Sequence, residues 1–418
     1  MKDQQIKALD KRLGDFVTHV TADMGRSERR QWAEVYLRGL LLDGERKSIE
    51  PMALRVGGDV QGVQQFVGQS PWAAEKVMEA LNKHMASAAA EGTYWIIDET
   101  SFPKAGQHSV GVARQYCGAL GKIANCQVAV TLHRSNEETS WPMGWKLYLP
   151  ENWISDTTLR KEAGIPEEID YQTKPALAVA LIDQVIAQAI APGVVLADQG
   201  YGAGFAWRAE VHQRGLSYCL AVGDDTGVWR QAAPKETPPY SGAGRPRKRP
   251  PRSEVVSLQQ IAMNLPKRAW RKITWRMGTK GKQTSRFACL EVCAAIRSKG
   301  NATRARWTEF ALIEWPSTEP LPTKYWLCWF RDDTSPDLLK LVRNAKARWR
   351  IEKDNRELKE ELGLDHFEGR GWLGWNHHVT LVTLAFAFLR LEQLRSKKNS
   401  WCYFADDPQA PSPDPHPA

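Results

Sequence analysis

The 418-residue sequence lacks any hydrophobic run long enough to cross a membrane. Its longest apolar stretch runs from Val379 to Leu389, which is about half of the ~20 residues that a spanning helix requires. The amino terminus, MKDQQIKALDKRL, has no apolar core of the kind that signal peptides carry. We therefore expect no membrane partner, and we interpret 379–389 as part of a buried helix.

Cysteine is scarce and scattered. The seven cysteines form an odd set in which only Cys289 and Cys293 are close in sequence. No further Cys or His near that pair completes a zinc site. This usage is typical of a reduced, intracellular protein, which we expect in the cytoplasm.

Acidic residues are in the minority. There are 48 Asp and Glu against 57 Lys and Arg, which gives a formal net charge of +9. Such an excess favours a polyanionic partner such as nucleic acid, although an acidic protein would fit the charge equally well. With 42% hydrophobic and 25% charged residues, the composition excludes a largely disordered chain.

Hydrophobic spacing divides the chain into five parts. Residues 1–90 have helical spacing, and both a helix–turn–helix and a plain helical bundle remain open. Residues 91–225 contain a three-strand meander and then strands that alternate with helices, which predicts a mixed α/β sheet flanked by helices. Residues 226–323 are predicted as a β-rich insertion with a basic loop. Residues 324–400 return to the core with a long helix from Pro336 past Leu362, and 401–418 form a proline-rich tail expected to be disordered.

Two aspartates, Asp98 and Asp198, each follow a short buried strand. A carboxylate at the carboxyl end of a strand is held rigidly where α/β sheets commonly bind ligands. The alternative is a structural one, because Asp also caps helices and stabilises turns. Neither aspartate alone distinguishes a ligand-binding role from a structural one.

A third carboxylate, Glu352, lies in the segment RWRIEKDNRELKEELGLDH. On a helical wheel it falls on one narrow face with Arg348, Arg356 and Lys359, beside the apolar stripe. The glutamates at 357, 360 and 361 fall on the side expected to meet water. Intrahelical ion pairs between i and i+4 neighbours would explain this face equally simply.

The three carboxylates together form an oxygen-ligand set for two Mg²⁺ ions, and Mn²⁺ is expected to substitute. Two such ions activate the attacking oxygen and stabilise the leaving oxygen of a phosphodiester. The cations on the helix face that carries Glu352 suit phosphate oxygens beside the metals. The combination predicts phosphodiester chemistry.

The carboxylates lie in WIIDETSFPKAG, VVLADQGYG and ARWRIEKDNRELKEELGLDHFEGRGWLGWNHHVTLVTLAFAFL. Together with ERKSIEPMA, QQFVGQSPW and WPMGWKLYLPENW, these segments resemble insertion-sequence DDE transposases, specifically the insertion sequence seven-oh-one family. The resemblance covers about residues 25–395. Arg348, Glu352 and Lys359 match a helical signature of related families, whereas Ala345 stands where that signature has Tyr.

The resemblance implies an RNase H-like catalytic core in which Asp98, Asp198 and Glu352 bind the metals and Arg348 and Lys359 bind phosphates. It implies cleavage at transposon ends followed by strand transfer into target DNA. The partners would be double-stranded DNA, as transposon ends and as target, and a second copy of the chain in a homodimer on DNA. An inactive transposase-derived DNA-binding protein and an RNase H-like nuclease that never joins strands are the alternatives.

Two further features are candidates for DNA contact. One is the basic cluster of the insertion, for which a solvated loop is the alternative; it comprises Arg245, Arg247, Lys248, Arg249 and Arg252. The other is Trp326 and Trp329, which relatives suggest for stacking on a flipped base. For both tryptophans, a place in the core of a buried strand is the simpler interpretation.

Overall fold

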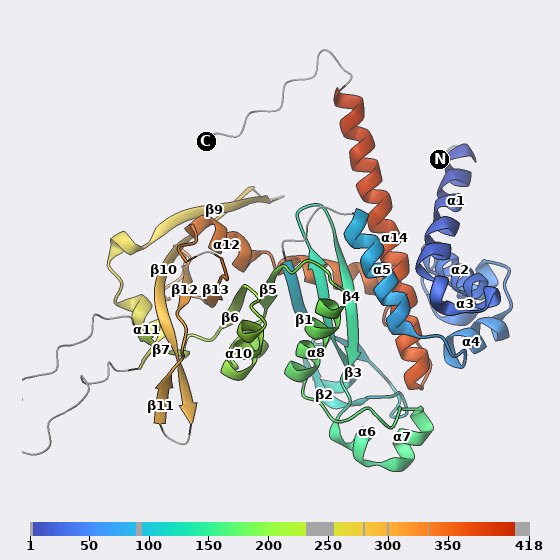
Figure 1. The fold of residues 1–418 in the computed structure, drawn as a ribbon, viewed down its shortest axis with the longest axis horizontal. Coiled ribbons are helices and arrows are strands. Elements are labelled where there is room, and N and C mark those ends of the chain that lie inside the picture. Colours follow the sequence, from blue (N-terminus) through green and yellow to red (C-terminus); the bar gives the residue numbers. More distant parts are fainter. Residues whose placement is uncertain are drawn as a thin grey trace, which may run out of the picture. The chain divides into compact units, whose positions relative to one another are not determined.

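The computed structural model describes residues 3–88, 94–230, 255–278, 281–298, 301–332 and 334–405. The chain divides into two compact units, whose elements are labelled in Figure 1. Unit 1 is drawn from 1–93, 99–191 and 350–418, and unit 2 from 94–98 and 192–349. These divisions cut the chain at other points than the boundaries predicted from hydrophobic spacing.

The amino-terminal part of unit 1 is helical, as the sequence predicts. Its helices are α1 (Asp3–Val20), α2 (Ser27–Leu41), α3 (Ile49–Arg55), α4 (Val60–Gly68) and α5 (Ala74–Ala88), with a short turn η1 (Ala22–Met24). Helix α14 (Trp372–Ala405) packs against α2, α4 and α5 (Figure 1). The apolar run at 379–389 therefore lies in a buried helix, as expected.

No helix in the described ranges is both long and apolar enough to cross a membrane.

The strands of unit 1 are the second half of β1 (Tyr94–Pro103), β2 (Ala113–Cys117), β3 (Lys122–Ser135) and β4 (Ser140–Leu147). The first part of β3 pairs with β2 and its second part with β4, both antiparallel. The remaining helices are α6 (Glu151–Ser155), α7 (Thr157–Ala163) and α8 (Lys174–Ala187). The three predicted strands are therefore joined by a fourth, β4, that hydrophobic alternation did not indicate. Their order corrects the predicted meander, because β3 and not β2 neighbours β1.

The burial of β4 explains why it was missed. Gly144 lies close to Leu181 of α8, while Trp145 donates a hydrogen bond to Thr383 Oγ1 of α14 at 2.9 Å. Both faces of the strand are therefore covered, and the alternation of apolar and polar residues disappears. Pro142, a residue rarely found inside a sheet, pairs with His133 beside an irregularity in the register.

Unit 2 begins with the first residues of β1 and continues with α/β elements. These are β5 (Val194–Ala197), α9 (Gln199–Gly202), α10 (Phe205–Gln213) and β6 (Tyr218–Val222). The predicted β-rich insertion follows as β7 (Gly227–Arg230), β8 (Val256–Ser257), α11 (Leu258–Met263), η2 (Lys267–Ala269), β9 (Arg271–Gly278), β10 (Gly281–Ser298), β11 (Asn301–Arg304) and β12 (Glu309–Trp315). Strand β13 (Lys324–Trp329) and helices α12 (Leu338–Lys346) and α13 (Trp349–Glu360) complete the elements.

The strand order confirms the predicted fold class. In unit 1, β1 neighbours β3, and the Lys104 N–H just beyond β1 donates to Asn125 O at 3.0 Å. In unit 2, β1 pairs in parallel with β5, and β5 pairs in parallel with β6. The antiparallel strands β2, β3 and β4 on one side of β1 and the parallel strands β5 and β6 on its other side form the RNase H-like arrangement, with helices covering the sheet.

One predicted helix is two helices. The sequence suggested a single helix from Pro336 past Leu362, whereas α12 ends at Lys346 and α13 begins at Trp349. The Ala347 N–H bonds to Asn344 O, three residues back, which tightens the last turn of α12. The interruption leaves Arg348 between the two helices.

The turn after Asp198 requires glycine at one position. A Cβ on Gly202 would meet the backbone oxygen of Ala221 on β6 closer than real side chains allow. A Cβ on Gly204 would find its nearest neighbour, Tyr201 O, at 3.5 Å, an ordinary contact. The sequence GYG therefore brings the chain behind Asp198 against β6.

We expect Gly202→Ala to lower the free energy of unfolding by about 2 kcal/mol, because the backbone of β6 must move to accommodate the added methyl group. Chemical denaturation of both variants measures the effect. Gly204→Ala is the matched control and should change the midpoint much less. Equal stability of the two variants would contradict the close approach.

Candidate active site

Strands β1 and β5 place the two aspartates side by side. Their parallel pairing matches Tyr94 with Val194 and Ile96 with Leu196, a constant offset of one hundred positions. Asp98 and Asp198 follow at that same offset, each two residues beyond the last matched pair. Because neighbouring strands lie ~4.8 Å apart, both carboxylates stand at one edge of the unit 2 sheet, half-buried.

Asp198 also performs the structural role that the sequence left open. Its Oδ1 accepts a hydrogen bond from Gly200 N–H at 2.9 Å at the start of the short helix α9. The backbone oxygen of Asp198 accepts from Gly202 N–H at 2.9 Å. These contacts fix the orientation of the carboxylate, so the capping and ligand interpretations are compatible.

Asp98 is paired with a cation. The Arg348 guanidinium donates from Nη1 to Asp98 Oδ2 at 3.0 Å, with the Asp98 side chain 15% exposed and that of Arg348 29% exposed. Arg348 reaches this position because it lies in the interruption between α12 and α13. The structure therefore brings together Asp98, Asp198 and Arg348, all in unit 2.

Helix α13 carries the other predicted residues, in unit 1. Glu352 and Arg356 are exposed to solvent. Lys359 is instead half-buried: its ammonium donates to Ser101 O at 2.9 Å and lies 5.5 Å from the centre of the Phe102 ring. Burial lowers the pKa of Lys359. In this structure the lysine attaches the end of α13 to the second half of β1.

A buried polar network, not anticipated from the sequence, holds the middle of α13. Asp354 is 1% exposed and accepts hydrogen bonds from Ser140 Oγ at 2.8 Å and Arg390 Nη2 at 3.1 Å. His133 Nδ1 lies 3.2 Å from its other oxygen. Burial alone would raise the pKa of Asp354, but these hydrogen bonds and the charge of Arg390 outweigh it and lower the pKa. The network joins α13 to β3, β4 and α14.

Glu357 corrects an expectation from the helical wheel. The wheel places this residue on the side that meets water, yet its carboxylate accepts from Arg390 Nη2 at 2.5 Å. Arg390 thereby bridges Glu357 and Asp354. The partner is on α14, which no pattern within α13 reveals.

The two candidate stacking residues sit in packed surroundings. Trp326 is 6% exposed, and the Lys346 ammonium lies 5.5 Å from its ring centre. Trp329 is half-buried against His212, with ring centres 4.3 Å apart. These positions favour the core interpretation of Trp326 in particular. The basic cluster 245–252 lies outside the described residues.

The two aspartates fit a divalent metal. Carboxylate oxygens are the ligands that Mg²⁺ prefers, and the contact of Asp98 with Arg348 shows that this carboxylate already accepts a positive charge at short range. Within the described ranges, no group of three or more His, Cys, Asp or Glu side chains is arranged to hold a metal ion. The structure thus places two carboxylates at one edge of the unit 2 sheet.

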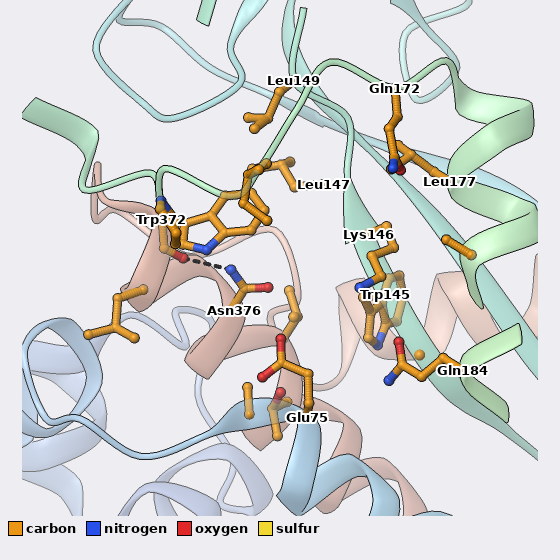
Figure 2. A pocket seen from close by; sticks show the side chains of 18 of the residues that line it. Glu75, Trp145, Lys146, Leu147, Leu149, Gln172, Leu177, Gln184, Trp372 and Asn376 are labelled. Carbon is orange, nitrogen blue, oxygen red and sulfur yellow. Dashed lines mark hydrogen bonds between the residues drawn. The ribbon is translucent and has the colours of Figure 1, made fainter. Parts of the chain in front are cut away.

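A cavity of about 550 Å³ in unit 1 is distinct from these residues. Figure 2 shows it lined by Glu75 of α5, Lys146 of β4, Gln184 of α8 and Asn376 of α14. Asn376 Nδ2 donates to Trp372 O at 2.9 Å within the lining. None of the predicted site residues lines this cavity.

Two comparisons with known sequences bear on this site. The family described as DDE superfamily endonuclease matches residues 18–282, more than half of the chain. This range includes Asp98 and Asp198 but ends before Glu352. A probable transposase for insertion sequence element IS701, from Microchaete diplosiphon, is 32% identical over 188 residues. That match covers 44% of this chain and 46% of the relative, so the chain spans about half the length of that relative.

A comparison of structures found a piggyBac transposase synaptic complex with hairpin DNA, determined by cryo-EM. The match covers 95% of this chain and 80% of the other, at 9% sequence identity and a TM-score of 0.42. A TM-score this low supports neither a fold nor a function.

We expect Asp354→Asn to lower the free energy of unfolding by about 3 kcal/mol, because it removes the charge that balances the buried Arg390 guanidinium. Glu360→Gln, at an exposed position of the same helix, removes an equal charge and should leave stability nearly unchanged. Urea denaturation of both variants gives the comparison. If the two variants are equally stable, the network does not hold α13.

Proposed function

Because this chain belongs to the DDE superfamily endonucleases, we propose that it is a DNA transposase. It would cut DNA at transposon ends and join the freed strand to target DNA. The observation that supports this most strongly is the register of β1 and β5, which puts Asp98 and Asp198 at equivalent ends of adjacent parallel strands. The segments around both aspartates lie within the family match.

We propose Asp98, Asp198 and Glu352 as the metal ligands. Glu352 is exposed on α13, one helical turn beyond Arg348, so its carboxylate is accessible to an ion. The buried network at Asp354 would keep this face of the helix turned outward. When bound, a pair of Mg²⁺ ions would activate the attacking oxygen and stabilise the leaving oxygen of the phosphodiester.

The cations near these carboxylates would bind DNA phosphates. Arg348 and Arg356 lie one turn before and after Glu352, and a guanidinium can bind a phosphate through two parallel hydrogen bonds. Arg348 would then exchange Asp98 for a phosphate oxygen when DNA arrives. Lys359, which contacts Ser101 O in this structure, would have to leave that contact to reach DNA.

The proposed reaction has two steps. Water attacks a phosphodiester at the transposon end, and the broken P–O bond leaves a 3′ hydroxyl. That hydroxyl then attacks a target phosphodiester, forming one P–O bond as another breaks, so no ATP is needed. Two ends must be held at once, and we propose a homodimer on double-stranded DNA for this purpose.

We expect Asp98→Asn, Asp198→Asn and Glu352→Gln each to abolish Mg²⁺-dependent cleavage, a loss of at least about 1,000-fold, while duplex binding stays within about threefold. The loss follows because an amide oxygen is a poor replacement for a charged ligand of a hard cation. The assay incubates the protein with Mg²⁺ and DNA carrying the ends of its flanking element, and scores cut and joined products on a gel.

Glu360→Gln is the control for this series, since it removes one carboxylate from an exposed position of α13. It should cut and join like the wild type. Cleavage retained in one of the three variants would remove that residue from the site. Cutting without any joined product would favour a nuclease over a transposase.

Arg348→Gln should raise the affinity for Mn²⁺ in the absence of DNA by about three- to tenfold, because the ion no longer competes with the guanidinium for Asp98. A tenfold change corresponds to about 1.4 kcal/mol. Electron paramagnetic resonance of unbound Mn²⁺ measures the affinity. Arg356→Gln removes an equal charge one turn beyond Glu352 and should change the Mn²⁺ affinity less. A weaker Mn²⁺ affinity in the Arg348 variant would refute competition between the guanidinium and the ion for Asp98.

A further inference from the structure

The insertion of unit 2 contains a long segment without acidic residues. Between Val255 and Leu290 there is no Asp or Glu, whereas eight residues are Lys or Arg. In a chain with 48 acidic residues, such a stretch concentrates positive charge on one part of the surface. The described part of the segment includes the turn η2, the strand β9 and the start of β10.

Strands β9 and β10 form an antiparallel ribbon with two different faces. Opposite residues share a face, and the pairs Phe287–Arg271 and Ser285–Ile273 belong to the inner one. Phe287 is completely buried there, and the Trp275 ring contacts it edge-on at 5.7 Å. The inner face therefore packs into unit 2, against α12.

The outer face carries exposed lysines. The pairs Lys272–Arg286 and Met277–Lys282 lie on it, with Lys272 and Lys282 exposed. Lys267 precedes the ribbon in η2 and is exposed, as is the adjacent Arg268. We call the strands β9 and β10, together with Lys272 and Lys282 on them and Lys267 and Arg268 just before them, the basic ribbon.

The charges of the basic ribbon are not balanced within the described part of the chain. None of its four exposed cations has an ion-pair partner there, whereas other cations of unit 2 do: Lys346 pairs with Glu314 at 2.5 Å. Uncompensated like charges repel one another and raise the local positive potential. A surface of this kind is suited to a polyanion, which would neutralise several of these charges at once.

The basic ribbon is also joined to the candidate site by two contacts within unit 2. Arg276 of β9 lies 4.0 Å above the ring of Trp349, an exposed residue at the start of α13. The preceding residue, Arg348, donates to Asp98 at 3.0 Å. Arg276 pairs with Gln283 on the inner face, so these contacts attach the inner face of the ribbon to the element that reaches the strand-end carboxylate, and a polyanion on the outer face would lie across the ribbon from that element. This continuity favours the substrate of that site over an unrelated acidic protein.

We propose that the basic ribbon binds the phosphate backbone of double-stranded DNA that flanks the scissile position. The inference rests on the proposed function and adds a DNA-binding element outside the signature helix. Lysine ammonium groups are point charges that contact phosphates without reading bases. The ribbon would thus supply affinity and register along the duplex, and leave sequence recognition to other parts of the protein.

The test replaces Lys267, Arg268, Lys272 and Lys282 by Ala in the full-length chain and measures binding of a 30-base-pair duplex by fluorescence anisotropy over a range of salt concentrations. Each phosphate contact contributes about 0.9 to the slope of log K against log salt. Losing up to four contacts should flatten this slope by up to about 3.6 and weaken binding at least about tenfold at 0.1 M salt.

A control variant removes four exposed lysines of unit 1, with the same change in net charge: Lys11, Lys76, Lys122 and Lys161. Its slope should change by less than about 1. A second variant, Lys272→Arg with Lys282→Arg, keeps the charge and should bind like the wild type. Circular dichroism confirms that each variant is folded.

The outcomes separate this inference from the proposed function. A wild-type slope in the ribbon variant overturns the inference, even where the protein still cuts and joins DNA. An equal loss in the ribbon and control variants shows that only net charge matters, and also overturns it. A wild-type protein that binds no duplex overturns both. Preference for an acidic protein over duplex at equal salt overturns the choice of partner.

Discussion

The parallel pairing of β1 with β5 is the constraint on which the candidate site depends. A register shift of one residue would turn one aspartate to the opposite face of the sheet, because side chains alternate along a strand. The register is held by buried apolar residues that precede each carboxylate, such as Ile96 and Leu196. The packing of these apolar residues thus determines where the carboxylates of Asp98 and Asp198 lie.

Helix α13 carries a buried carboxylate that fixes the position of an exposed one. Glu352 and Asp354 are two positions apart, yet the first is exposed and the second is 1% exposed. Asp354 is held by Ser140 and Arg390. A buried ion pair contributes little net stability compared with apolar packing, but removing one partner is costly. We therefore interpret the network as fixing the rotation of the helix about its axis.

Much of the fold could be predicted from local pattern. Alternation and apolar runs located most strands of both units, and the fold class followed from the order of strands and helices. The strand β4 was missed because it is covered on both faces, which removes the alternation on which the prediction relies. The break before α13 was missed because Arg348 and its neighbours are all acceptable helix residues, and their role depends on Asp98, 250 positions away.

The candidate site was less predictable than the fold. The same helical wheel places Asp354 at about 240°, near the apolar stripe, so its burial could have been anticipated. Its partners His133 and Arg390 could not, since they come from a strand and a helix far away in the sequence. The basic ribbon had a sequence signal, the absence of acidic residues, but only the register of β9 and β10 separates its outer face from its inner one.

The path of the chain has a consequence for dissecting this protein. Unit 1 is assembled from three stretches of sequence and unit 2 from two, and the passages between them interrupt β1 and the start of α13. No single proteolytic cut releases either unit with all of its strands. A truncated fragment would therefore lose a central strand or the anchor of α13, and partial products should misfold rather than retain half of the activity.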